Sequence, residues 1–187
     1  LSASIASYQF SGTPTSSLGS GTAITLNGDP VNMLTGNLVH TERDILIKSR
    51  GLPIIFERTY NSRTPKDGPL GFGWTHSFNQ YLSFKGVESA EAKVSWVDGS
   101  GAEHFYKTAA QSSGNITVGT TLSAQPGVYQ AFTRRADGFY SIREKNGLTY
   151  VFEAINGTAT NTNQKARLLS VTDRNGKKRP LNGTLYF

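Results

Sequence analysis

The residues of this chain best suited to catalysis are its three histidines, His40, His76 and His104. His40, Glu42 and Asp44 alternate along one run, so on a strand they would share a face and could in principle offer an imidazole and two carboxylates to one metal ion. Alternate residues of a strand lie about 7 Å apart, which rarely lets three side chains converge on an ion about 2 Å away. We therefore expect a structural role for this trio and keep a metal hydrolase only as a remote alternative.

The other two histidines are also expected to be structural. His76 lies between Trp74 and Phe78 in an alternating run, where a hydrogen-bonded core or subsurface imidazole is the ordinary outcome. His104 lies beside a predicted hairpin and is expected to be solvated. The chain has no cysteine, which excludes thiol catalysis, disulfides and thiolate metal sites.

Two further patterns resemble catalytic motifs only in composition. Ser100 stands between two glycines, but it belongs to a predicted hairpin turn and lacks the strand-to-helix setting of a nucleophile elbow. The segment from Gly68 to Gly73 is rich in glycine, yet no helix follows whose N-terminal amides could bind a phosphate. We therefore predict no enzymatic activity, no metal and no cofactor.

Composition predicts an all-β fold. The 187 residues suffice for one principal domain, and they include 20 glycines, 7 prolines and 11% aromatic residues, a profile of strands joined by tight turns. We expect antiparallel strands and hairpins in a sandwich or meander-like sheet. No apolar run is long enough to span a bilayer.

The net charge of +6 raises the question of a nucleic-acid partner. The concentrated basic residues Arg174, Lys177, Lys178 and Arg179 flank an Asn-Gly turn, without a helix or an aromatic stacking ladder. A solvated hairpin tip is the favoured interpretation and no nucleic-acid partner is predicted. Attraction to an acidic partner or a membrane surface is the minority alternative.

The first 27 residues form an arm rich in Ser, Thr and Gly. Leu1–Ile5 and Ala23–Leu26 alternate apolar and polar side chains, which suits strands that pair along an edge. Strand donation to a partner is therefore a hypothesis for this arm. Because the chain begins at Leu1 without an initiating Met, we expect a processed or excised piece.

The strands of the first half follow from alternation and from turn residues. We predict two strands at Leu38–Glu42 and Asp44–Ile47, and a third at Ile54–Tyr60. The prolines and glycines of residues 61–73 predict a long loop without regular structure. Trp74–Lys85 alternates aromatic or aliphatic with polar residues and is the clearest predicted core strand.

The second half predicts a meander. Asp98–Gly101 separates the two strands of one hairpin, and Asp137-Gly138 and Asn146-Gly147 mark two more tight turns. The strands expected around these turns are Val94–Val97, Glu103–Lys107, Tyr129–Thr133, Phe139–Arg143 and Leu148–Glu153. Helical signals are poor, and only Glu88–Lys93 could form a turn or two of helix.

Five short motifs carry a resemblance to a known family. They are Gly-Asp-Pro-Val-Asn at 28–32, Thr-Gly-Asn at 35–37, Gly-Leu-Pro at 51–53, Arg-Thr-Tyr-Asn-Ser at 58–62 and Gly-Phe-Gly-Trp at 71–74. In this order and spacing they resemble the domain that opens the shell of Rhs and YD-repeat proteins, which bacteria export as polymorphic toxins or surface proteins. Residues 167–176 are similar to one YD-repeat unit, without its Tyr-Asp pair.

The resemblance implies a division into a strand-donating arm at 1–27, an Rhs-associated β domain at 28–165 and a repeat-like unit at 166–187. It brings no catalytic residues and implies architectural positions instead. Gly36, Gly51 and Gly73 are expected to supply unusual backbone angles, Trp74 to anchor the core, and Arg58 to form an ion pair. The full set is Gly28, Asp29, Pro30, Gly36, Asn37, Gly51, Pro53, Arg58, Tyr60, Gly71, Gly73 and Trp74.

The resemblance also implies a role and a place. We expect a non-enzymatic, exported structural module, secreted or on the surface of a bacterial cell, that pairs strands with the remainder of an Rhs shell. One alternative is the subunit of an extracellular fibre, polymerised by donating the arm to an identical copy. Another is an adhesin with a glycan surface formed by Tyr60, Tyr81, Tyr106, Tyr129, Tyr140 and Tyr150.

Overall fold

The computed structural model describes residues 31–32, 36–49, 51–64, 67–88, 91–109, 116–154 and 164–181. Every regular element in these ranges is a β-strand, which confirms the all-β prediction. In the part of the chain described, no helix has the length and apolar character that a membrane span requires.

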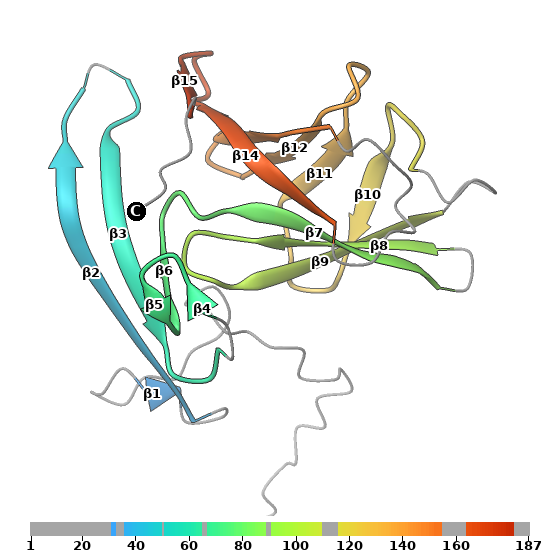
Figure 1. The fold of residues 1–187 in the computed structure, drawn as a ribbon. Coiled ribbons are helices and arrows are strands. Elements are labelled where there is room, and N and C mark those ends of the chain that lie inside the picture. Colours follow the sequence, from blue (N-terminus) through green and yellow to red (C-terminus); the bar gives the residue numbers. More distant parts are fainter. Residues whose placement is uncertain are drawn as a thin grey trace, which may run out of the picture.

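One antiparallel sheet has four strands in the order β1-β2-β3-β6. Its strands are β1 (Val31–Asn32), β2 (Asn37–Ile47), β3 (Ile54–Asn61) and β6 (Trp74–His76). Figure 1 shows β2 and β3 as a long, curved hairpin that stands beside the rest of the molecule. We call this the outer sheet.

The larger sheet is closed, because each of eight successive strands pairs with the next and the last pairs with the first. These strands are β7 (Tyr81–Glu88), β8 (Glu91–Val97), β9 (Glu103–Ala109), β10 (Thr121–Ala124), β11 (Ala131–Arg134), β12 (Tyr140–Arg143), β13 (Thr149–Phe152) and β14 (Lys165–Thr172). A ninth strand, β15 (Lys178–Pro180), pairs with the second half of β14. We call the eight-stranded ring the closed sheet.

Two strands turn the corners of the closed sheet. The first half of β10 pairs with β11, and its second half pairs with β9. Likewise, β14 pairs with β7 at Lys165–Arg167 and then with β15 at Ser170–Thr172, while β13 lies on its other side. Figure 1 shows β7, β8 and β9 crossing the directions of β10 and β11, so two layers meet at these corners.

The core lies inside the closed sheet, where alternate residues of each strand point inward. Rings from opposite layers meet there: Phe84 lies 5.4 Å from Tyr140, and Tyr106 lies 4.9 Å from Phe132. The buried core residues are Leu82, Phe84, Ala92, Val94, Trp96, Tyr106, Ile116, Leu122, Phe132, Tyr140, Ile142, Phe152, Ala166 and Leu168. Burial of this apolar surface is the main source of stability.

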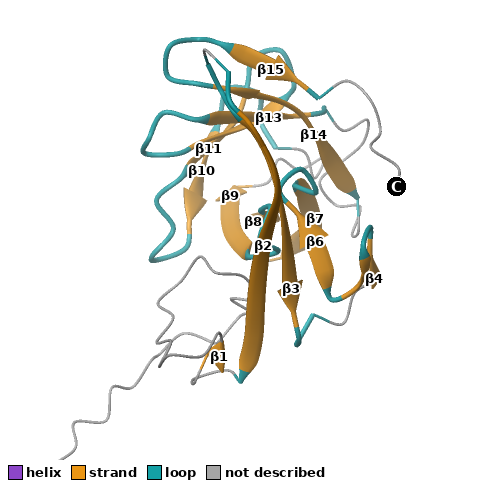
Figure 2. Ribbon diagram, turned by 90° about the vertical axis from the view of Figure 1, so that its left-hand side faces the viewer, coloured by secondary structure: helices purple, strands orange, loops and turns teal. Residues whose placement is uncertain are grey.

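The predicted hairpins and meander are confirmed, and the turns show why. Gly101, Gly138 and Gly147 all have positive φ, which glycine adopts at little cost. A turn carboxylate also accepts backbone hydrogen bonds, as Asp98 Oδ1 does from the N–H groups of Ser100 and Ala102. Figure 2 shows these loops between the strands of the closed sheet.

The prediction of one strand over Trp74–Lys85 is wrong, because the chain passes from one sheet to the other within it. β6 ends at His76 and pairs with β3, whereas β7 starts at Tyr81 and pairs with β8 and β14. Polar residues make the break: Asn79 N donates to His76 O, and Gln80 Nε2 donates to Ser77 O.

Three smaller predictions are also corrected. The two strands expected over Leu38–Ile47 form the single strand β2, with a bulge at Asp44. The loop over residues 61–73 contains a small hairpin of β4 (Asp67–Gly68) and β5 (Gly71–Phe72). At Glu88–Lys93 the chain is strand on both sides of residues 89–90, so no helix is present at the described positions.

Candidate interaction edge on the outer sheet

Three side chains of the resemblance motifs, Arg58, Tyr60 and Trp74, lie together on one face of the outer sheet. The register places Tyr60 opposite Trp74, and Arg58 beside both. The rings of Tyr60 and Trp74 lie 5.3 Å apart, and the Arg58 guanidinium lies 5.4 Å from the centre of the Trp74 ring. All three side chains are half-buried. Trp74 therefore anchors this face of the outer sheet, whereas we had predicted that it would anchor the core.

Arg58 forms the predicted ion pair. Its guanidinium donates two hydrogen bonds to Asp44, at 2.6 and 2.9 Å, and this contact raises the pKa of Arg58. Asp44 is the bulged residue, for which the β2–β3 register gives no partner on β3. The bulge therefore directs an acidic side chain of β2 toward a cation of β3.

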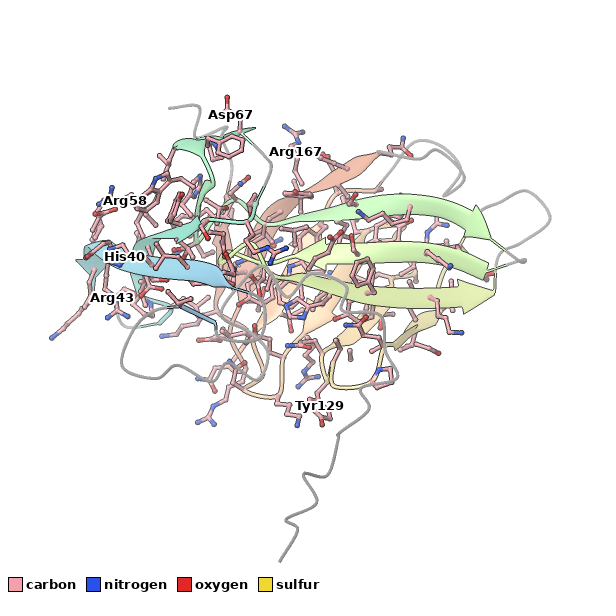
Figure 3. The ribbon with its side chains drawn as sticks, turned by 90° about the horizontal axis from the view of Figure 1, so that it is seen from below. His40, Arg43, Arg58, Asp67, Tyr129 and Arg167 are labelled. Atoms are coloured by element: carbon pink, nitrogen blue, oxygen red, sulfur yellow. The ribbon has the colours of Figure 1, made fainter. Side chains whose placement is uncertain are left out.

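The structure does not bring His40, Glu42 and Asp44 together around one point. His40 Nε2 lies 3.0 Å from Glu42 Oε1, whereas Asp44 is held by Arg58. Figure 3 shows His40, Arg43 and Arg58 at the outer-sheet end of the molecule. Among the residues that the structure describes, no three His, Cys, Asp or Glu side chains are placed to hold a metal ion.

A buried polar junction connects the outer sheet to the closed sheet. Asn61 Nδ2 donates to the carbonyl oxygen of Ser100 in the β8–β9 turn, and Asn37 Nδ2 donates to Asn61 Oδ1. Asn37 and Asn61 are only 1% and 2% exposed, and replacing Asn61 would break both of these buried hydrogen bonds. Asn61 belongs to the motif at 58–62, but no role was predicted for it, since its partners lie far away in sequence.

Gly36 and Gly73 have the expected left-handed backbone, at φ +66° and +77°. Gly71 shares this feature at φ +100°. Gly51 does not have a left-handed backbone. Glycine is favoured there because a Cβ would lie only 2.8 Å from Lys177 Cδ. Sequence reasoning missed a role for Gly68, where a Cβ would lie 1.9 Å from the carbonyl oxygen of Trp74.

The two remaining histidines are both buried. His76 is 5% exposed, stacks on Phe56 at 5.1 Å, and accepts a hydrogen bond from Phe78 N at Nδ1. His104 is 8% exposed and lies 2.9 Å from Asp98 Oδ2, so the expectation of a solvated side chain is wrong. Asp98, at the start of the same hairpin turn, is the polar partner of the buried His104 imidazole.

The pKa of His76 predicts how stability depends on pH. Burial lowers this pKa below the ordinary 6.5, so the unfolded chain binds the proton at a higher pH than the folded chain does. This contribution to stability is therefore complete above about pH 6.5 and declines as the pH falls below that value. The loss of thermal stability between about pH 7.5 and about pH 5.5 should be smaller in His76→Gln.

The matched control is His40→Gln, which changes an exposed histidine of the same sheet. It should keep the full pH-dependent loss of the unchanged protein, measured as the midpoint of thermal unfolding by circular dichroism. An equal loss in the His76 and His40 variants would contradict the role given to burial of His76.

Two of the six tyrosines proposed for a glycan surface lie in the core. Tyr106 and Tyr140 are 2% and 3% exposed and belong to the core, and burial raises the pKa of both hydroxyls. Tyr129 is 70% exposed but lies in the β10–β11 connection, where Lys145 Nζ is 3.9 Å from its ring centre.

Within the described part of the chain, one edge of β2 has no strand beside it over most of its length. β1 pairs only with Asn37 and Leu38, while β3 pairs along the other edge. Leu38 directs its N–H and C=O toward Ser62, after β3, so by alternation the backbone groups of Val39, Thr41 and Arg43 face away from β3. Among the described residues no strand pairs with this edge beyond Leu38, and we call this open part of the strand, from Val39 to Ile47, the β2 edge.

Gly28, Asp29 and Pro30, which the resemblance singled out, lie outside the described residues.

Apolar side chains are exposed at the far end of the same strand. Ile45, Leu46 and Ile47 are 47%, 47% and 53% exposed. Three consecutive half-exposed aliphatic residues beside an open strand edge are typical of a surface that another protein covers. The β2 edge therefore offers backbone groups along Val39–Arg43 and an apolar surface at Ile45–Ile47.

Comparison with known proteins found a match to one family model and a similarity to one Rhs protein. Residues 28–106 match a family model described as a domain of unknown function (DUF6531). A stretch of 52 residues is 38% identical to the probable deoxyribonuclease RhsB of Dickeya dadantii (strain 3937). That stretch covers 28% of this chain and 4% of RhsB, so the chain corresponds to a small part of that relative. The family match spans the described strands from β1 into β9.

Proposed function

We propose that this chain is a non-enzymatic structural module of the Rhs type, which opens a shell and pairs its β2 edge with a strand of other protein. The proposal places it outside the cell or on the cell surface of a bacterium. Supporting it are the motif resemblance, the family match over residues 28–106 and the similarity to RhsB.

The observation that carries this proposal is the β2 edge. An edge strand presents a row of unpaired N–H and C=O groups, and a partner strand gains main-chain hydrogen bonds by adding to it. On β2 this row is combined with the exposed side chains of Ile45–Ile47, which a partner strand could cover. Main-chain bonds and apolar burial would then act on the same strand.

The charges in the middle of β2 restrict what can pair there. Arg43 is paired with Glu57 at 2.6 Å, and Asp44 is paired with Arg58, so these charges are satisfied within the hairpin. Charges and bulges on an edge strand discourage indiscriminate pairing. The partner strand must therefore accommodate the bulge at Asp44, which favours a dedicated partner over aggregation.

A non-enzymatic role also fits the placement of the catalytic candidates. His76 and His104 are buried and hydrogen-bonded, and Asp44 is held by Arg58. The name of RhsB describes the activity of a protein of which the matched stretch covers only 4%. We assign that activity to parts of such proteins beyond the matched stretch.

The second candidate, a fibre of identical copies, rests on the same edge. Any copy exposes its own β2 edge, and the alternating segments of residues 1–27 are candidates for the added strand. Deleting residues 1–27 separates the two roles. Loss of polymer with a folded monomer supports the fibre, and unchanged assembly contradicts it.

Replacing Thr41 by proline tests the β2 edge directly. Proline removes an outward N–H in the middle of the edge, so particles assembled by strand pairing should give way to monomers. Thr41→Val keeps the N–H and loses only the hydroxyl contact with Thr59, so it should assemble like the unchanged protein. Sedimentation velocity over a range of protein concentrations measures the particle size.

Hydrogen exchange followed by NMR supplies the second readout. In the monomer, the amides of Thr41 and Arg43 should exchange faster than those of His40 and Glu42, which face β3. In assembled particles the outward amides should become protected. The proposal fails if Thr41 and Arg43 are already protected in the monomer, or if particles form while both amides stay open.

A further inference from the structure

Cationic side chains meet at the tips of two neighbouring hairpins. Lys48 comes from the β2–β3 turn, and Arg174, Lys177, Lys178 and Arg179 come from the β14–β15 hairpin. Figures 1 and 2 both show these two turns side by side at one end of the molecule. We call these five residues the basic tip.

Direct contacts fix the two turns to each other. The Arg179 guanidinium donates to the carbonyl oxygens of Pro53, at 2.7 Å, and of Leu52. Gly51 lies so close to the Lys177 side chain that an added Cβ would be 2.8 Å from Lys177 Cδ. The cations of the two hairpins therefore form a single surface with a defined shape.

The positive charge of the basic tip is weakly balanced. Residues 48–53 and 173–179 contain one acid, Asp173, against six cations, which are the five of the basic tip and Arg50. Asp173 Oδ1 accepts the N–H groups of Asn175 and Lys177, at 2.9 and 2.8 Å, so its carboxylate closes its own turn. Six cations against one carboxylate leave a formal +5 in these two segments, out of +6 for the whole chain.

Apolar residues are mixed with these cations. Ile47, which directly precedes Lys48, is 53% exposed, and Pro53 at the end of the same turn is also exposed. Nucleic-acid recognition uses aromatic stacking or base contacts, for which convex turn tips with aliphatic residues are poorly suited. An anionic bilayer suits this combination better, because the cations can contact the lipid phosphates while the aliphatic residues enter the headgroup region.

We propose that the basic tip docks this protein on an anionic lipid bilayer. Lys48, Arg174 and Lys178 contact headgroup phosphates, while Arg179 holds the two turns together, and Ile47 and Pro53 enter the polar boundary of the membrane. This contact is peripheral and goes beyond strand pairing at the β2 edge, because it uses the turn tips and not the strand edge.

Co-sedimentation with vesicles tests the proposal on the whole chain. The protein should bind phosphatidylcholine vesicles that contain phosphatidylglycerol, should not bind pure phosphatidylcholine, and should be released as salt rises past about 0.15 M. Combining Lys48→Glu with Lys178→Glu changes one cation in each turn, and it should weaken binding by about thirtyfold or more.

A second pair of substitutions controls for net charge. Arg135→Glu with Lys165→Glu changes the charge equally, but Arg135 lies in the β11–β12 turn and Lys165 at the end of β14 remote from the basic tip. Binding should stay within about fivefold of the unchanged protein. Equal losses in both pairs, or no binding to phosphatidylglycerol vesicles at low salt, would overturn the proposal.

Two further measurements separate the alternatives. A DNA duplex that binds more tightly than the vesicles, and loses binding in the tip variant, would identify a nucleic-acid surface and reject the lipid proposal. Thr41→Pro should bind vesicles like the unchanged protein, so failure of strand pairing and failure of lipid docking are distinguishable. Circular dichroism confirms that each compared variant is folded.

Discussion

Replacing Phe84 by alanine is expected to lower the free energy of unfolding by about 3 to 5 kcal/mol, the largest effect of any single substitution considered. Phe84 is 0% exposed and lies on β7, and its ring is 5.4 Å from the ring of Tyr140 on β12. The substitution removes contacts between the two layers and leaves a cavity. The midpoint of thermal unfolding should fall by roughly 6 to 20 °C.

Phe105→Ala is the matched control for this prediction. This substitution removes the same atoms as Phe84→Ala, but Phe105 is only half-buried. It lies on β9 between the buried residues His104 and Tyr106. Its loss should be about 1 to 2 kcal/mol, because partly exposed apolar surface contributes less. Equal losses at the two positions, measured by denaturant unfolding, would show that the closed sheet is not held by its interior.

The contrast between Phe84 and Trp74 shows what alternation in a sequence can predict. Both residues lie on the apolar face of one alternating run, and Phe84 is in the core as that pattern indicates. Trp74 belongs to another sheet, because the chain bends between His76 and Tyr81. Period-two alternation identifies a buried face, but it carries no information about which sheet the face belongs to.

Turns could be predicted because their causes are local. Asp98, Asp137 and Asn146 accept backbone N–H groups two residues further along, and a glycine with positive φ completes each turn. These interactions need only four or five consecutive residues. The hairpins they define were therefore predicted correctly from the sequence.

Closure and the β2 edge could not be predicted, because both depend on distant partners. β7 meets β14 through Leu82 and Ala166, which are more than eighty residues apart in the sequence. The bulge at Asp44 can be recognised only from the alignment of β2 with β3. Without that alignment, the sequence predicted two strands where the structure has one. The motif glycines and Arg58 could be named from the family resemblance. The β2 edge could be recognised only from the pairing of β2 with β1 and β3.

Replacing Gly73 by alanine is the second large effect, expected to cost about 2 to 4 kcal/mol of unfolding free energy. Gly73 has φ +77°, and a Cβ there would lie 2.9 Å from Asn61 O and 2.8 Å from Tyr60 Cε2. Gly73 O also accepts the N–H of Asn61, the residue that joins the outer sheet to Ser100 of the closed sheet. Strain at Gly73 is thereby transmitted to the junction of the sheets.

Gly36→Ala separates the backbone cost from the steric cost. Gly36 has a similar φ of +66°, but nothing lies within 4 Å of an added Cβ, so only the left-handed conformation is penalised, by about 1 kcal/mol. The difference between the two alanine variants in denaturant unfolding measures how tightly β6 is pressed against β3. If both lose the same stability, Gly73 is needed only for its backbone angle, and the close approach that positions Tyr60 and Trp74 has no energetic weight.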